Sequence, residues 1–147
     1  MSRIQDLSPD PKSHIKTLMR IGYTLSSAVS DIIDNSITAK SSSIEIYAPP
    51  GLDNPMISIL DNGNGMSPDE LIANMKIGCK DPSMERDEND LGRFGSGMKT
   101  ASFSQARRLT VISKKKGHPI SAAVWDIDRI EQTNSWQLEI LDDEEIK

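Results

Sequence analysis

Apolar residues recur along this chain at two spacings, and each spacing predicts a kind of element. Between Thr24 and Ala39 they recur every three or four positions, which predicts a helix that begins after a Thr24 cap. Helices are also predicted over 12–20, from Ser67 onward and over 96–107. Apolar runs and alternating patterns predict strands over 43–47, 56–60, 109–114, 120–126 and 136–141.

Helices and strands follow one another in this order without the strict β-α-β alternation of a parallel sheet. The order therefore predicts an α+β fold, a two-layer sandwich of helices on a sheet. The 147 residues correspond to about one domain. Residues 1–11 are polar and punctuated by proline, which predicts an arm. Residues 78–90 are charged and lack apolar periodicity, which predicts a mobile loop.

Composition narrows the class of protein. Hydrophobic residues make up 36% of the chain and charged residues 27%, as in globular proteins. The net charge of -5 argues against a dedicated nucleic-acid-binding domain, because such domains bind by neutralising phosphates. One cysteine and two histidines argue against a disulfide and a structural zinc centre. No segment has the pattern of a secretory signal or a membrane span, so we expect a cytoplasmic protein without membrane contact.

The segment ILDNGNGM, residues 59–66, places Asp61 at the end of a predicted strand and ahead of two glycines. A hairpin would need a returning strand, but a helix start follows. A calcium loop would need oxygen-bearing side chains where Gly63 and Gly65 stand. A carboxylate at a strand end, followed by glycines that allow close approach, suits recognition of an exocyclic amine. An Asx turn that leads into the helix is the alternative.

The helix predicted after Thr24 carries a second polar pattern. Its apolar face centres on three residues, Leu25, Val29 and Ile32. Asp31 and Asn35 are one turn apart at the margin of this face, whereas Asp34 falls on the opposite side and is expected to be exposed. A carboxylate and a carboxamide at a half-buried margin indicate a functional site. A local hydrogen bond between the two side chains is the alternative.

A glycine-rich segment precedes the helix predicted over 96–107, with glycines at Gly92, Gly95 and Gly97. Free backbone N–H groups at the positive end of a helix predict an anion site. Gly92 and Gly97 have the spacing of a P-loop. However, Met98 stands before Lys99 and Thr100, and a charged loop precedes the segment where a P-loop would follow a strand. The P-loop is therefore the weaker interpretation.

In this order and spacing, over residues 24–115, the three motifs resemble the N, G1 and G2 boxes of the GHKL ATPases. That superfamily includes DNA gyrase, the ninety-kilodalton heat-shock chaperones, histidine kinases and MutL. The segments SSAVSDIIDNSITA and GRFGSGMKTAS are most similar to MORC-type ATPases and related bacterial ATP-binding proteins. The resemblance implies a Bergerat fold, with helices on one face of a mixed, mostly antiparallel sheet. It also implies that residues 1–147 are an ATP-binding domain, the N-terminal part of a longer protein, because the family's Gly-Thr pair does not occur here.

The resemblance implies ATP and Mg²⁺ as ligands and assigns roles to the motif residues. Asp61 would accept a hydrogen bond from the adenine amine, with Gly63 and Gly65 admitting the base and Met66 packing on it. Asn35 would ligate Mg²⁺. The phosphates would lie against a set of residues around the third motif: Gly92, Gly95, Ser96, Gly97, Met98, Lys99 and Thr100. Of these, Lys99 would neutralise phosphate charge.

Asp31 would be the general base of hydrolysis. Most GHKL ATPases have glutamate at this place, and aspartate is one methylene shorter, which displaces the carboxylate by about 1 Å. Because such a misplacement can cost about 10²-fold in rate, slow hydrolysis is expected, below the enzymatic median of about 10 s⁻¹. Two alternatives stay open: an ATP-binding regulatory module without turnover, and a protein-histidine phosphotransferase, which the lack of an upstream histidine helix disfavours.

The resemblance also implies partners and motions. Residues 78–90 would be an ATP lid whose closure accompanies ATP-dependent homodimerisation, with the arm before Pro11 as a dimer contact. DNA would be engaged only through parts outside this chain.

Overall fold

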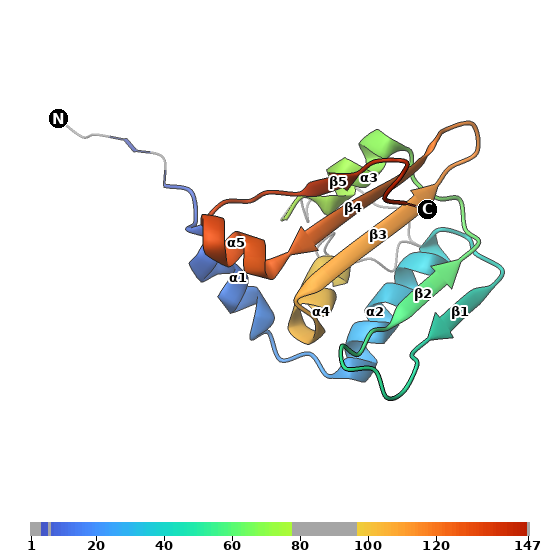
Figure 1. The fold of residues 1–147 in the computed structure, drawn as a ribbon, viewed down its shortest axis with the longest axis horizontal. Coiled ribbons are helices and arrows are strands. Elements are labelled where there is room, and N and C mark those ends of the chain that lie inside the picture. Colours follow the sequence, from blue (N-terminus) through green and yellow to red (C-terminus); the bar gives the residue numbers. More distant parts are fainter. Residues whose placement is uncertain (1–3, 6, 78–96, 147) are drawn as a thin grey trace.

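The computed structural model describes residues 4–5, 7–77 and 97–146 (Figure 1). The helices are α1 (Pro11–Met19), α2 (Leu25–Thr38), α3 (Pro68–Met75), α4 (Gly97–Gln105) and α5 (Ile127–Thr133). The strands are β1 (Ile44–Tyr47), β2 (Ser58–Asp61), β3 (Arg108–Lys114), β4 (Ile120–Asp126) and β5 (Glu139–Leu141). No helix among these is long and apolar enough to cross a membrane. The predicted lid, residues 78–90, lies outside the described residues.

The strands form two hydrogen-bonded groups, and each described pairing is antiparallel. β1 pairs with β2, with Ile44 opposite Asp61, and β4 lies between β3 and β5. In Figure 1 helices α2, α3 and α4 lie on one side of the strands, where α2 contacts β2, α3 contacts β4 and α4 contacts β3. This arrangement of helices on one face of antiparallel strands confirms the predicted two-layer α+β class.

Local signals start the helices where the sequence predicts them. Thr24 caps α2 in a capping box with Ser27, and Ser67 caps α3 in a capping box with Glu70. In each box the cap side chain and the residue three positions later satisfy two backbone N–H groups that the helix leaves unbonded. Glu70 also binds Lys115 at 2.6 Å, and this contact, with the Ser67 backbone bond, lowers the pKa of Glu70 to about 2.

The main core lies between β4 and the helices on its inner face. It consists of Ile15, Leu71, Met75, Phe103, Ala123, Trp125, Ile127 and Ile130, which come from α1, α3, α4, β4 and α5. The Trp125 indole donates from Nε1 to the Met75 carbonyl at 2.9 Å, and its ring packs edge-on against Trp136. This bond satisfies a carbonyl oxygen in the last turn of α3, which helix formation leaves without a partner.

Helix α5 was not predicted, because the apolar run of β4 leads directly into it. Asp126 ends the strand and caps the helix by accepting hydrogen bonds from the backbone N–H groups of Asp128 and Arg129. At its other end Asn134 adopts a left-handed conformation, with φ of 48°. The Asp-x-Asp-Arg spacing after an apolar strand was the available signal for this helix start.

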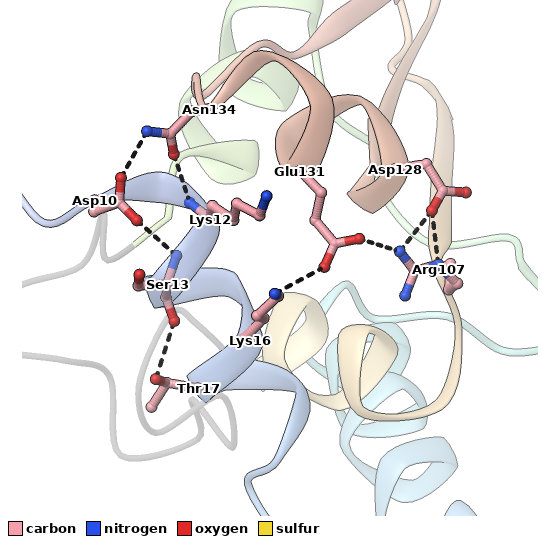
Figure 2. Close-up of polar contacts among 9 residues, drawn as sticks. All are labelled: Asp10, Lys12, Ser13, Lys16, Thr17, Arg107, Asp128, Glu131 and Asn134. Atoms are coloured by element: carbon pink, nitrogen blue, oxygen red, sulfur yellow. Dashed lines mark hydrogen bonds and ion pairs between the residues drawn. The ribbon is translucent and has the colours of Figure 1, made fainter.

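The end of α5 holds the beginning of α1 in place (Figure 2). Asn134 accepts a hydrogen bond from the Lys12 backbone at 3.0 Å and donates one to the Asp10 carboxylate at 2.7 Å. Asp10 in turn caps α1 through the Ser13 N–H group. These contacts attach the segment that follows the arm to the core, whereas Leu7 within the arm is 83% exposed.

Candidate functional site

The first part of the candidate site lies where α2 faces the beginning of α4. Asp31 is half-buried on α2, and a Cβ atom added to Gly97, the first residue of α4, would lie 3.8 Å from Asp31 Oδ2. Asn35 is exposed and donates from Nδ2 to the Asp31 backbone carbonyl at 2.9 Å. This bond uses the Asp31 backbone carbonyl and not the Asp31 carboxylate. Two motifs that are far apart in sequence thus meet.

The buried face of α2 differs from the predicted one. Leu25, predicted at its centre, is 52% exposed, whereas Ala28 and Ser36 are buried. Asp34, predicted to be exposed, is half-buried. The projection ranked residues by hydrophobicity, but α4 packs against α2 and Ser36 bonds to β2, so small side chains occupy the contact face. The predicted face was wrong for this reason.

Asp61 connects α2 with the end of β2. Its Oδ2 accepts a hydrogen bond from Ser36 Oγ at 2.8 Å, and its Oδ1 accepts one from the Gly63 N–H at 2.9 Å. The bond to Gly63 is the Asx-type turn that the sequence offered as an alternative. Asp61 makes both the turn and the contact with α2. An ionised carboxylate has about four lone-pair sites and these bonds use two of them, so the turn does not exclude a ligand.

The two glycines after Asp61 lie against the chain itself. A Cβ atom on Gly63 would lie 2.7 Å from the Cβ and carbonyl oxygen of Ala39, at the end of α2. A Cβ atom on Gly65 would lie 2.1 Å from the carbonyl oxygen of Lys114, and Gly65 has a φ of +67°. The need for glycine at both positions therefore has a cause within the fold. Their predicted contact with a base stays a prediction.

Both methionines of the predicted site pack against the core. Met66 and Met98 are half-buried and contact the core cluster. The Met66 backbone N–H also donates to Ser113 Oγ at 2.8 Å, which joins the loop after β2 to the end of β3. Nucleotide contact by either side chain remains a prediction.

Lys99 and Thr100 lie in the first turn of α4, and both are buried. The Lys99 side chain is 2% exposed, and its ammonium donates to the Asn74 carbonyl of α3 at 2.5 Å. A buried cation needs such partners, because burial without them costs several kcal/mol. In this structure Lys99 joins α4 to α3, a contact that the predicted phosphate role did not anticipate. The other predicted phosphate contacts, Gly92, Gly95 and Ser96, lie outside the described residues.

The structure adds two residues that the sequence did not point to, Tyr23 and Ser36. The Tyr23 hydroxyl donates to Asp31 Oδ2 at 2.8 Å. This hydrogen bond, together with burial and the charge of Asp31, raises the pKa of Tyr23 above its ordinary value. Ser36 is 3% exposed and links α2 to Asp61. Ser36 could have been found in the sequence because it directly follows Asn35, whereas Tyr23 lies outside all three motifs.

A cavity of about 290 Å³ adjoins Asp61, with Ser43, Glu45, Leu60, Asp61 and Asn62 in its lining. Its size is near the lower end of the range for small-molecule sites, about 300–1,000 Å³. Another cavity, of about 330 Å³, lies between α1 and α5 and contains none of the predicted site residues. Its lining consists of Lys16, Met19, Arg20, Arg107 and Glu131.

Comparisons with known proteins identify the family to which the chain is similar. Residues 23–147 match the family described as histidine kinase-, DNA gyrase B- and HSP90-like ATPase. The mouse protein ATPase MORC2B is 32% identical over 60% of this chain and 9% of its own length. The chaperone protein HtpG of Paramagnetospirillum magneticum is 37% identical over 52% of this chain and 14% of its own length. The DNA mismatch repair protein MutL of Bacillus mycoides is 33% identical over 92% of this chain.

The chain spans only a part of each of these relatives, at most 21% for MutL. The match to MutL covers more of the chain than the match to the MORC protein, so the likeness extends beyond the MORC-type branch that the sequence motifs favoured.

Proposed function

The chain belongs to the histidine kinase-, DNA gyrase B- and HSP90-like ATPase family, and we propose that it binds ATP with Mg²⁺ and hydrolyses it slowly. One observation carries the proposal: the residues of three separate motifs converge around α2. Asp61 is hydrogen-bonded to α2 through Ser36, and the first residue of α4 faces Asp31. An acceptor for an amine, an oxygen ligand and a helix N-terminus are the groups that an adenine nucleotide requires.

Asp61 is the residue proposed to recognise adenine. The lone pairs that Ser36 and the Gly63 N–H leave unused can accept a hydrogen bond from the exocyclic amine. Since Ser36 and Gly63 hold both carboxylate oxygens, the acceptor is oriented before the base arrives.

Asn35 is the residue proposed to ligate Mg²⁺, and its surroundings fit that role. Its Nδ2 is bonded to the Asp31 carbonyl, which leaves Oδ1 as the atom available to a cation. The side chain is exposed, and carboxamide oxygens are ligands that Mg²⁺ accepts together with phosphate oxygens and water. When bound, the ion would neutralise phosphate charge.

Asp31 is the residue proposed to act as general base. In the reaction a water proton passes to the Asp31 carboxylate, and the water oxygen bonds to the γ-phosphorus. The bond from the γ-phosphorus to the bridging oxygen breaks, and ADP leaves with its electron pair. Asp31 faces the first residue of α4, which brings the base next to the proposed phosphate site. The short aspartate side chain favours slow turnover.

We further propose that residues 78–90 close as a lid over the bound nucleotide and that closure promotes a homodimer with the arm as a contact. The phosphates are proposed to lie against Gly92, Gly95, Ser96, Gly97, Met98 and Thr100, with Lys99 neutralising their charge. We propose no DNA contact for the residues of this chain, because its net charge is -5.

Calorimetric titration of Mg²⁺ and ATP into the wild type and Asp61→Asn tests the binding proposal. A hydrogen bond to a charged group contributes about 1.5–3 kcal/mol, so the variant should bind about 10- to 100-fold more weakly. Asp53→Asn is the matched control, because Asp53 is exposed in the loop at the other end of the β1–β2 hairpin. Equal affinity of Asp61→Asn and the control would contradict the assignment of Asp61.

Phosphate release at saturating ATP tests turnover. Wild-type release that falls at least tenfold in Asp31→Asn, with unchanged affinity, would support hydrolysis. ATP binding without release would support the second candidate, a regulatory module, which the short Asp31 side chain also favours. Transfer of the labelled γ-phosphate to protein would instead identify a phosphotransferase.

A further inference from the structure

Tyr23 makes a direct contact with Asp31 that the motifs do not account for. The phenol donates to Oδ2 of the Asp31 carboxylate at 2.8 Å, across eight residues of sequence. Tyr23 lies just before the Thr24 cap of α2 and is half-buried. A hydrogen bond to a charged acceptor is about twice as strong as a neutral one and fixes the direction of the carboxylate. Tyr23 precedes the cap, so its side chain reaches forward along α2 to Asp31.

The backbone of Tyr23 is itself held from two sides. Its N–H donates to the Ile21 carbonyl at 2.6 Å, and its carbonyl accepts a hydrogen bond from Gln105 Nε2 at 3.1 Å. Gln105 is the last residue of α4, and Gly97 at the other end of the same helix faces Asp31. The Tyr23 phenol and the first residue of α4 therefore both lie next to the Asp31 carboxylate. The last residue of α4 also binds the Tyr23 backbone, so α4 contacts both partners of this hydrogen bond.

We propose that Tyr23 is a positioning residue for Asp31: its hydroxyl holds Oδ2, the carboxylate oxygen that faces the first residue of α4, and so fixes the direction in which the carboxylate meets the attacking water. This inference rests on the proposed hydrolysis. It explains how an aspartate can serve where the carboxylate reaches about 1 Å less far than a glutamate would. If Asp31 is held in one orientation, it spends less time in orientations that cannot accept the proton. Hydrolysis should therefore slow less than it would with a freely rotating aspartate.

Asp31 is also the group that accounts for the raised pKa of the Tyr23 phenol, since loss of the phenol proton would place a second negative charge beside the carboxylate. The two α4 residues described at this contact, Gln105 and Gly97, carry no charge. The contact can therefore be measured in the protein without nucleotide. Tyr23 and Tyr47 are the tyrosines of the chain, so Tyr47→Phe leaves Tyr23 as the single phenol.

The first test is a spectroscopic titration of the phenol in the Tyr47→Phe background. Phenolate absorbance should develop at lower pH when Asp31→Asn is added, because the carboxylate that opposes ionisation has been removed. The same midpoint with and without Asp31→Asn would overturn the proposed contact. Since this measurement needs no ATP, it does not depend on the proposed function.

The second test is a double-mutant cycle on turnover at saturating Mg²⁺ and ATP. Tyr23→Phe should lower kcat about tenfold without changing ATP affinity, and it should have no further effect in the Asp31→Asn background. Tyr47→Phe makes the same chemical change on exposed β1 and should leave kcat at the wild-type value. A role in folding alone would lower thermal stability and would not produce this coupling with Asp31.

The outcomes separate the two proposals. Turnover that depends on Asp31 but is equal in Tyr23→Phe and Tyr47→Phe would overturn the positioning role and leave the proposed ATPase activity intact. Turnover that does not change in Asp31→Asn, or a folded wild type that binds ATP and releases no phosphate, would overturn both.

Discussion

Replacing Gly65 with alanine tests how the loop after β2 is built. The position has a φ of +67°, and an added Cβ would lie 2.1 Å from the Lys114 carbonyl oxygen and 2.7 Å from its carbonyl carbon. Both atoms belong to the backbone of β3, so no side-chain rotation can make room. The loop or the strand end must move by about 1 Å to restore an ordinary contact distance. That movement would strain the bond between the Met66 N–H and Ser113 Oγ.

Two costs add at this position. A residue with a Cβ in the left-handed region costs about 1–2 kcal/mol. Forcing extra volume into a packed contact costs about 1–3 kcal/mol more. Gly65→Ala should therefore lower the free energy of unfolding by about 2–5 kcal/mol, a large part of the total for a domain, about 5–15 kcal/mol. Displacement of the loop should also weaken ATP binding, because Asp61 precedes it directly.

Gly51→Ala is the matched control. Gly51 also has a positive φ, +75°, but no atom lies within 4 Å of its added Cβ. It should therefore show only the conformational cost of about 1–2 kcal/mol. Urea denaturation of the wild type and both variants, followed by tryptophan fluorescence, measures the difference directly if the dependence on denaturant is unchanged. Equal losses in the two variants would refute the argument that the backbone of β3 excludes a side chain at Gly65.

Three further predictions concern other contacts of the fold. The pKa of Glu70 is lowered from 4.5 to about 2, chiefly by the hydrogen bond from Lys115, so its stabilising effect should be complete above about pH 4.5 and lost as the pH falls toward 2. Thermal unfolding of Glu70→Gln should depend less on pH in that window, and an unchanged profile would contradict the ion pair. Trp125→Phe removes the donor to the buried Met75 carbonyl and should cost about 1–3 kcal/mol in urea denaturation, whereas wild-type stability would show that the bond contributes nothing. Asn134→Ala should be less stable than Asn134→Gly by about 1 kcal/mol in the same assay, because both lose the contacts with α1 but only glycine suits a φ of 48°; the reverse order would argue against the left-handed cap.

Elements whose start and stop signals lie within a few residues were predicted well. The Thr24 and Ser67 caps start α2 and α3 as predicted, and β4 has the predicted limits of Ile120 and Asp126. Such signals need only neighbouring backbone groups, so the sequence is sufficient to find them. The ATPase family was also predicted correctly, since three ordered motifs carry more information than any one of them.

Predictions that depend on which element packs against which were weaker. Leu25 was placed on the buried face of α2 by its hydrophobicity, but the contacts with α4 and β2 select the small residues Ala28 and Ser36. The bond from the Lys99 ammonium to the end of α3 was not predicted, and the phosphate role of Lys99 stays a prediction. In both cases the partner is distant in sequence, so no local pattern could identify it.

The sequence by itself determined the two-layer class, through the order of its helices and strands, and the family and the candidate site residues, through the order of its motifs. The residue types of the motifs and the spacing between them are properties of the sequence, so they can be read without knowing how the chain folds. Only the tertiary structure decided which atoms meet: Ser36 with Asp61, Tyr23 with Asp31, and Gly65 with the backbone of Lys114. Hydrogen bonds and steric contacts act over a few ångströms, and the distances between these residues exist only when the helices have packed on the sheet.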